Sequence, residues 1–553
     1  MKLNSITIFI IIAINFSCQA KVSLIYNIEG NSINQGQRVS FTALAFEHGK
    51  VLNSGDKNEL LKKYPTAHLI DGQGKAMLPG LHDAHAHIMN YSRLQNQVDL
   101  SGIGSLQESL NKIKQFAETH PDEEWILGRG WNQVLWQNKQ FPSKKDLDNL
   151  AINRPIWLRR IDGHAGWANS QAMQIGGSSG YEKDIAGGEI IEDQNGIQTG
   201  VYVDNAMNII EKEIPQESAF VTLDYMLNGL NKLASLGLTS IDDAGIDYQT
   251  YQAYKLLAKN KLMPIRINAM LASNDSHLAQ MLQKPVHDKN DFLQIHSIKY
   301  VFDGALGSRG AAMIKPYSDR PDSFGLIVQT QEFIEKIAYG NAAQGWQIAI
   351  HSIGDRANRI ALNIMADKRA LTQQNRNRVE HAQIVSPDDL PLFKKFNIIA
   401  SMQPTHATSD MNMAEDRIGK QRLQGAYAWQ TLLKEGVVIA SGSDFPVELA
   451  NPFYGLHAAV TRQSRDNKPN KGWIASEKMT LEQALASFTI QAAYANRKEK
   501  VLGSLEPGKW ADFILVDQNI FSIDSQDIWK TQVLQTWVAG TKIYSAPITT
   551  KTL

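Results

Sequence analysis

Short apolar segments alternate with helical ones through the middle of the chain, and this alternation restricts the fold more than any other feature. Residues 348–350 and 437–440 read as buried strands, and residues 333–344 and 426–434 have helical patterns. Such a rhythm is typical of a parallel βα architecture. The stretch 118–215 is rich in turn residues and tryptophan and lacks the rhythm, so we expect it to be an insertion.

Both ends of the chain have a different pattern. Residues 22–26 and 38–42, and near the other end 512–517 and 533–538, are short alternating runs between turn signals, which is typical of strands. We therefore expect 21–78 and 499–553 to form one small β-sandwich domain, with the βα unit at 79–498 between its halves.

The first 20 residues resemble an export signal. Lys2 precedes an apolar stretch at 6–14, which is too short to span a bilayer, and small and polar residues follow up to Ala20. Cleavage after Ala20 would give a periplasmic or secreted protein. The alternative is lipoprotein anchoring at Cys18.

Composition excludes several classes of function. Among 553 residues, 43% are hydrophobic and 20% charged, and Lys plus Arg equals Asp plus Glu at 56 each. This balance favours a small neutral substrate over nucleic acid, and no later stretch resembles a membrane span. The single cysteine rules out an internal disulfide and cysteine metal ligands. The sequence specifies no oligomeric state.

The strongest local signal is the segment 78–87, Leu-Pro-Gly-Leu-His-Asp-Ala-His-Ala-His. On a strand, His85 and His87 point to the same side and can chelate one metal ion, with Asp83 on that same face. The apolar run and the Pro-Gly before the motif favour this interpretation over surface histidines.

Four further candidates lie at or near the ends of predicted strands: Lys299, His351, His381 and Asp444. Each could by itself be an ordinary satisfied polar residue. Together they fit a βα barrel, in which residues far apart in sequence converge at the carboxyl ends of the strands.

The chain resembles the amidohydrolase superfamily, within it the branch related to N-substituted formamide deformylase, over nearly the whole mature sequence. Besides 79–87, the segments that carry the resemblance are 161–165, 169–170, 199–201, 302–309, 351–355, 380–383, 401–406, 442–446 and 503–512. The resemblance implies a TIM-like (β/α)₈ barrel with two divalent metal ions, zinc by preference and otherwise Fe, Mn or Co.

The resemblance also implies roles for the candidate residues. His85, His87 and Asp444 would hold the first metal ion, and His351 and His381 the second. Lys299, carboxylated to a carbamate, would bridge the two ions. The alternative is an unmodified lysine paired with Asp303 or a nearby carboxylate, which leaves a one-metal site.

The expected reaction is hydrolysis of a carbon–nitrogen bond outside peptides, in a linear amide or formamide, by metal-activated hydroxide. Asp444 would take a proton from the attacking water and deliver it to the leaving nitrogen. Family-like segments place His164, Arg309, Trp131 and Trp167 near the substrate, although both tryptophans could equally be core residues.

Two alternatives remain at this point. The same barrel could open a cyclic amide or deaminate a heterocycle, and product analysis separates these reactions. A solute-binding barrel without catalysis would require substituted ligand positions, and the sequence has none.

Overall fold

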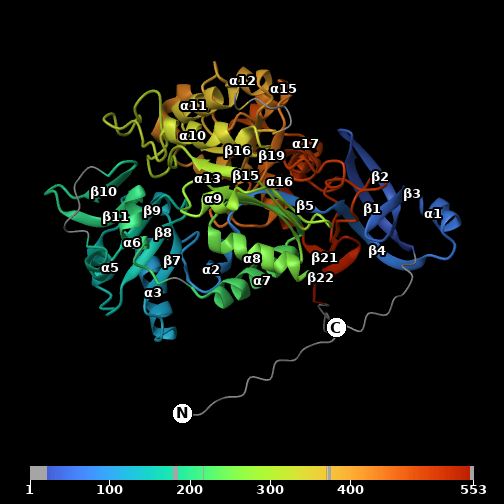
Figure 1. The fold of residues 1–553 in the computed structure, drawn as a ribbon, viewed down its shortest axis with the longest axis horizontal. Helices are drawn as coiled ribbons and strands as arrows, with labels where there is room; N and C mark the ends of the chain where they lie inside the picture. Colours follow the sequence, from blue (N-terminus) through green and yellow to red (C-terminus); the bar gives the residue numbers. More distant parts are fainter. Residues whose placement is uncertain (1–21, 178–184, 216, 369, 371–374, 548–553) are drawn as a thin grey trace, which may run out of the picture.

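The computed structural model describes residues 22–177, 185–215, 217–368, 370 and 375–547. The predicted export signal at 1–20, with Cys18, lies outside these residues. Within the described chain the strands form three sheets. Figure 1 shows them side by side: the insertion on the left, the barrel in the centre and the sheet from the two chain ends on the right.

The central sheet is a nearly closed barrel of eight parallel strands, which confirms the predicted TIM-like fold. Its strands are β5 (Leu81–Ala86), β12 (Leu238–Ile246), β13 (Arg266–Ala272), β15 (Leu293–Val301), β16 (Gln347–Ser352), β17 (Arg378–His381), β18 (Ile399–Met402) and β19 (Ile439–Ser441). The short strand β14 (Val286–His287) pairs antiparallel with β15. The predicted strand at 348–350 lies within β16.

The gap between β19 and β5 is bridged by the segment that carries Asp444. The amide nitrogen of Asp444 donates to the carbonyl oxygen of His85 at 2.7 Å. The carboxylate of Asp83 accepts from the backbone nitrogen and the hydroxyl of Ser443 at 3.0 and 2.6 Å. Asp83 therefore serves the closure of the barrel, and its oxygens are used by hydrogen bonds rather than directed at a metal ion.

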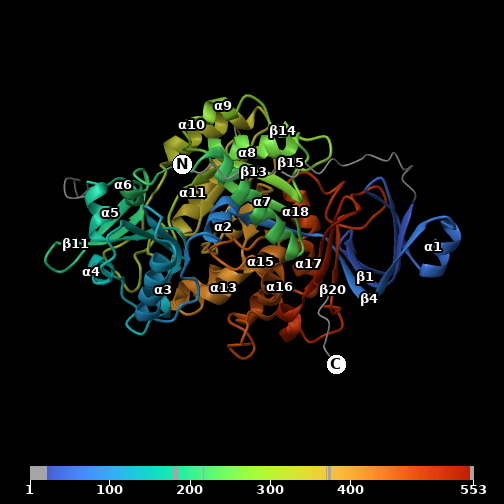
Figure 2. The ribbon, with the colours of Figure 1, turned by 90° about the horizontal axis from the view of Figure 1, so that it is seen from below.

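Helices surround the barrel (Figures 1 and 2), and their sequences explain why they form there. In α7 (Ala219–Ser235) the side chain of Ser218 caps the first turn, and Met226, Leu230 and Leu233 form one buried stripe at helical spacing. The other helices of this unit are α2 (Ile88–Leu94), α8 (Tyr248–Lys259), α9 (Leu278–Met281), α10 (Gln331–Ala342), α11 (Asp355–Ala366), α12 (Leu390–Lys395), α13 (Pro404–Asp410), α14 (Ala414–Arg422), α15 (Trp429–Lys434), α16 (Pro452–Thr461), α17 (Leu481–Ser487) and α18 (Ile490–Ala495).

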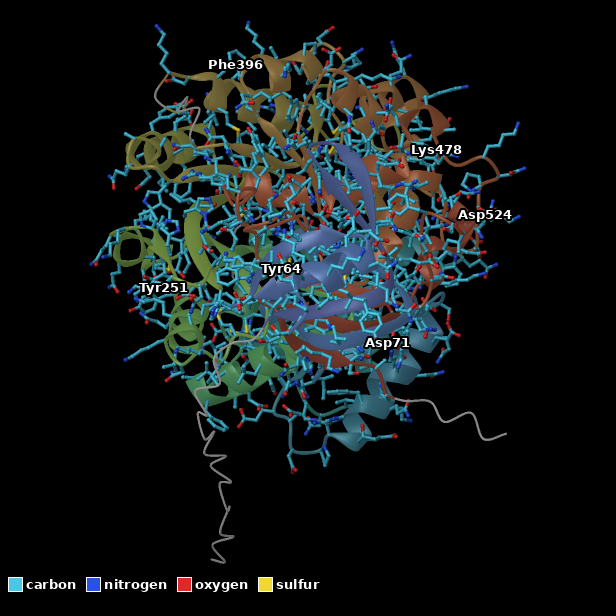
Figure 3. The ribbon with its side chains drawn as sticks, turned by 90° about the vertical axis from the view of Figure 1, so that its right-hand side faces the viewer. Tyr64, Asp71, Tyr251, Phe396, Lys478 and Asp524 are labelled. Carbon is cyan, nitrogen blue, oxygen red and sulfur yellow. The ribbon has the colours of Figure 1, made fainter. Side chains whose placement is uncertain are left out.

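The two chain ends, which we expected to form one small β-sandwich domain, share a single sheet of seven strands in the order β22-β21-β20-β4-β1-β2-β3. Figure 3 faces this sheet, with Tyr64 and Asp71 labelled. In its core Phe513 and Trp537 stack, and Phe46 packs against both rings, which joins the first and last parts of the chain. Its elements are β1 (Ser23–Asn34), β2 (Gln37–Glu47), β3 (Lys50–Gly55), α1 (Lys57–Lys63), β4 (His68–Pro79), β20 (Phe513–Val516), β21 (Val533–Val538) and β22 (Thr541–Ser545).

The insertion has a sheet and hydrophobic cores of its own. Its sheet begins at Val98, so the inserted segment starts before the predicted residue 118. Helical and strand patterns at its start are as regular as those of the barrel, and the sequence rhythm alone could not separate them. Its elements are β6 (Val98–Asp99), α3 (Leu106–Thr119), β7 (Ile126–Trp131), α4 (Lys144–Asp148), β8 (Ile156–Arg160), β9 (Ala165–Ala168), α5 (Ser170–Ile175), β10 (Gly188–Glu192), β11 (Gln198–Asp204) and α6 (Asn208–Glu211).

None of the helices in the described ranges is both long enough and apolar enough to cross a bilayer.

Candidate metal centre and active site

The carboxyl ends of the barrel strands bring together residues from distant parts of the chain. Nε2 of His87 lies 3.2 Å from Oδ1 of Asp444, and Nε2 of His85 lies 3.8 Å from the same oxygen. The amine of Lys299 lies 3.1 Å from Nε2 of His85. His85, His87 and Asp444 each offer one ligand atom within 4.8 Å of the others, which is close enough for a shared metal ion.

A second group of possible ligands adjoins the first and shares Asp444 with it. This group contains His381, His406 and Asp444. Nε2 of His406 lies 3.6 Å from Oδ2 of Asp444, and the rings of His351 and His381 are 4.5 Å apart. Asp444 thus directs one oxygen towards each group of histidines.

His406 is the residue of this centre that the sequence analysis did not propose as a ligand. It lies on α13, one turn beyond the end of β18, rather than on a strand. The segment 401–406 belongs to the family-like motifs, so the signal was present in the sequence. A rule that looks for ligands at strand ends passes over a histidine in the following helix.

Unpaired polar atoms show that the centre suits a metal ion. Nε2 of His351 and Nε2 of His406 are buried, and neither has a hydrogen-bond partner among the described residues. Buried polar atoms are rarely left unpaired unless something else satisfies them. Imidazole nitrogens and a carboxylate are ligands that suit Zn²⁺ and also Fe²⁺, Mn²⁺ and Co²⁺.

Burial sets the charge of these groups. It lowers the pKa of His85 to about 4 and holds the pKa values of His351 and His381 well below their usual range. Neutral imidazoles, which metal binding requires, are therefore the stable form at neutral pH. Burial alone would raise the pKa of Asp444, but the hydrogen bond from His87 and the nearby imidazoles outweigh it and keep this pKa low. Burial lowers the pKa of Lys299 to about 8.

Two of the candidate ligands have a backbone conformation that non-glycine residues rarely adopt. His381 has φ of 74° and Asp444 has φ of 61°. Such conformations cost about 1–3 kcal/mol each and gather at functional sites. Their presence at two converging strand ends supports a role for these residues in function.

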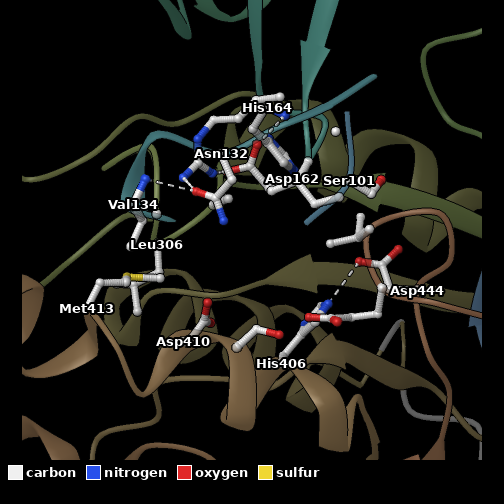
Figure 4. A pocket seen from close by; sticks show the side chains of 18 of the residues that line it. Ser101, Asn132, Val134, Asp162, His164, Leu306, His406, Asp410, Met413 and Asp444 are labelled. Atoms are coloured by element: carbon white, nitrogen blue, oxygen red, sulfur yellow. Dashed lines mark hydrogen bonds and ion pairs between the residues drawn. The ribbon is translucent and has the colours of Figure 1, made fainter. Parts of the chain in front are cut away.

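The insertion supplies the wall opposite the metal centre. Nδ1 of His164 donates to Oδ1 of Asp204 at 2.6 Å, and the ring of His164 lies 5.2 Å from that of His351. Burial would lower the pKa of His164, but the carboxylate of Asp204 outweighs it and raises this pKa. In Figure 4, His164 and Asp162 face His406 and Asp444 across the pocket.

The space between these walls is a cavity of about 420 Å³, which is in the range of small-molecule sites. Its inner part contains His351, His381 and Asp444. Its outer part includes two exposed apolar side chains, Leu135 from the insertion and Leu449 from the loop after β19, which are 43% and 50% exposed. The cavity thus has a polar floor and a partly apolar entrance.

Three residues expected near the substrate do not line this cavity. Trp131 and Trp167 are fully buried in the core of the insertion, where their indole nitrogens donate to backbone carbonyls of Leu158 and Ser143 at 2.7 and 2.9 Å. Their size and apolar rings favour packing over an exposed wall. Arg309 forms an ion pair with Asp319 at 2.9 Å outside the cavity. Of the residues expected to bind substrate, His164 lines the cavity.

Comparison with known proteins agrees with the fold. The sequence matches the amidohydrolase family over residues 68–544. The chain belongs to the amidohydrolase family. It is similar to Protein LONG AFTER FAR-RED 3 of Arabidopsis thaliana, at 30% identity over 91% of this chain and 88% of the relative. It is also similar to the N-substituted formamide deformylase of Arthrobacter pascens, at 24% identity over 87% of this chain and 90% of the relative.

Among solved structures, an uncharacterized metal-dependent hydrolase from Pyrococcus horikoshii OT3 has the same fold, with a TM-score of 0.74 and 24% identity. The match covers 91% of this chain and 99% of that one. Together with the candidate ligands at the strand ends, family membership identifies this amidohydrolase as a metal-dependent enzyme that hydrolyses carbon–nitrogen bonds other than peptide bonds.

Proposed function

We propose that this amidohydrolase cleaves linear amides of the N-substituted formamide type, with two zinc ions held by His85, His87, His351, His381 and Asp444. The observation that carries the proposal is the position of Asp444 at the floor of the cavity. Its Oδ1 faces His87, and its Oδ2 faces His406, which groups with His381 and adjoins the proposed second ion. The name of the Arthrobacter relative supports the substrate class.

The metal ions, when bound, would lower the pKa of water and polarise the amide carbonyl. Residues of the chain itself transfer the protons. Asp444 remains ionised because its pKa is held low, so it can accept a proton from the attacking water. The same carboxyl then delivers the proton to the leaving nitrogen, which departs as a neutral amine rather than as an anion. Water and the amide are consumed, and one acid and one amine are formed.

His164 holds the substrate from the other side of the cavity. Its ring is fixed by Asp204, so Nε2 is the atom left to meet a polar group of the bound amide. Leu135 and Leu449 at the entrance suit an apolar substituent on the nitrogen, because burial of each methylene group contributes about 0.8 kcal/mol.

The test is product analysis with metal-loaded protein and a series of N-alkyl and N-aryl formamides. Formate and a primary amine in equal amounts are expected. Release of ammonia from an aminated heterocycle, with no cleavage of formamides, would contradict the proposal and favour deamination.

We propose also that the enzyme is exported, on the strength of the apolar stretch at 6–14 and the small residues that follow it. Fractionation of the producing cells should place the enzyme outside the cytoplasm without its first residues. An intact Met1 on protein from the cytosol would contradict export.

A further inference from the structure

Glu380 is fully buried beside the metal centre, although it belongs to neither group of possible ligands. It directly precedes His381 on β17. One carboxylate oxygen accepts a short hydrogen bond from Nδ1 of His85. The other lies 2.5 Å from Nε of Arg378. The carboxylate therefore joins a candidate ligand to a buried cation.

Arg378 also contacts a second carboxylate, on the other side of the barrel interior. Its guanidinium lies 2.8 Å from Asp242 on β12, and Asp242 in turn lies 2.7 Å from Nε2 of His82. The side chains of Arg378 and Asp242 are fully buried. His82 and His85 are both on β5, so the network starts and ends on the strand that carries the His-x-His motif. We call His82, Asp242, Arg378, Glu380 and His85 the buried network.

The buried network fixes the protonation of His85. The buried ion pair with the guanidinium of Arg378 stabilises Glu380 as a carboxylate. A carboxylate can only accept a hydrogen bond, so Nδ1 of His85 must carry the proton. Nε2 then presents its lone pair towards Asp444 and Lys299, at 3.8 and 3.1 Å.

We propose that Glu380 is a positioning residue of the metal centre, which orients His85 for metal binding and adds a negative charge behind it. The inference rests on the proposed metal centre. A carboxylate that accepts the second ring hydrogen of a ligating histidine fixes the ring and makes it more basic. Arg378 and Asp242 keep Glu380 in place, because an isolated buried carboxylate would be unstable.

Metal affinity tests this proposal without relying on activity. The wild type, Glu380→Gln and Glu380→Asp are stripped of metal and titrated with Zn²⁺ against a chromophoric chelator. Loss of such a partner typically weakens metal affinity roughly tenfold to a hundredfold, and we expect that loss for Glu380→Gln. Glu380→Asp keeps the charge beside Arg378 but is one methylene shorter, so we expect a weaker hydrogen bond to His85 and an intermediate affinity.

Asp512→Asn is the matched control. Asp512 is also buried and binds an arginine, Arg266, at 2.6 Å, but it lies at the contact between the barrel and the shared sheet. This variant should lose stability and keep the Zn²⁺ affinity of the wild type. With Co²⁺ in place of Zn²⁺, the visible absorption bands should shift in both Glu380 variants and remain unchanged in Asp512→Asn.

The outcomes separate the inference from the proposed function. A wild type that binds no Zn²⁺ would overturn the metal centre itself. A wild type that binds Zn²⁺, with equal affinity and equal Co²⁺ bands in both Glu380 variants, would overturn only the role of Glu380. If Glu380→Gln does not fold, the Zn²⁺ affinity and the Co²⁺ bands of Glu380→Asp test the role of Glu380. This variant is expected to fold because it keeps a carboxylate beside Arg378.

Discussion

The amine of Lys299 lies 3.1 Å from Nε2 of His85, inside the group of candidate metal ligands. An ammonium group there would repel divalent ions and has no lone pair to offer them. The alternative partner considered for it, Asp303, is instead held by the backbone nitrogens of Ala312, Ile353 and Gly354. We therefore propose that Lys299 carries a carbamate, whose negative charge would suit two metal ions.

Lys299→Ala should lose the second metal ion and most of its activity, and a short carboxylic acid in excess should restore part of both. Lys498→Ala, which removes a lysine paired with Asp291 at 2.6 Å away from the centre, is the control and should retain its metal content. Elemental analysis and turnover check both variants. A density map with an unmodified amine more than about 4 Å from either metal ion would contradict the bridging role.

Asp444→Asn keeps the size of the side chain but removes its basic oxygen. Turnover should fall by roughly 10²- to 10⁴-fold, the range typical of general acid–base groups. Metal content is measured on the same samples, so that loss of a ligand is separated from loss of proton transfer. Near-normal turnover in metal-loaded Asp444→Asn would assign the proton transfer to another residue.

His164→Asn tests the contribution of the insertion to substrate binding. Loss of a buried hydrogen bond costs about 1–3 kcal/mol, so kcat/KM should fall by roughly five- to 150-fold while the metal content stays at the wild-type level. Trp167→Phe removes an indole hydrogen bond in the core of the insertion and should lower stability with little effect on kcat/KM. Equal losses of kcat/KM in the two variants would argue against a direct role for His164.

The stability of the metal-free protein should depend on pH through His296. This ring is buried on β15, and burial, with the charge of Arg497 next, holds its pKa well below its usual range. The unfolded chain binds this proton below about pH 6.5 and the folded chain does not, so the free energy of unfolding falls as the pH drops. The slope from this group is at most about 1.4 kcal/mol per pH unit.

His296→Gln removes that contribution, while all other histidines remain. Chemical denaturation between pH 7.5 and 5 should therefore show the wild type losing stability relative to the variant as the pH falls. A stability difference that does not change with pH would show that His296 does not titrate in this way.

Single strands could be predicted from local sequence patterns, whereas contacts between distant parts of the chain could be predicted only through the family resemblance. The strand at 533–538 is found as β21, because alternation on a half-buried strand is a local signal. The pairing of β20 with β4 joins residues more than 400 positions apart, and no local pattern contains it. The place of His406 beside Asp444 depends on how α13 follows the end of β18, which is also a tertiary feature.

The surroundings of the two tryptophans could not be predicted from the sequence either. Composition cannot distinguish a buried core ring from a cavity wall, and Trp131 and Trp167 proved to be core. Glu380 was visible only as a member of a family-like motif. Its importance comes from contacts to His85 and Arg378, and the partner His85 is 295 positions away.

Activity of the protein after exhaustive removal of metal tests the central claim most directly. The purified enzyme should carry between one and two divalent metal ions per chain, and His85→Ala or His351→Ala should carry fewer. Chelated protein should release no amine from an N-substituted formamide, and added Zn²⁺, Mn²⁺ or Co²⁺ should restore the rate as metal content returns. Full activity in protein shown to be free of metal would contradict the account.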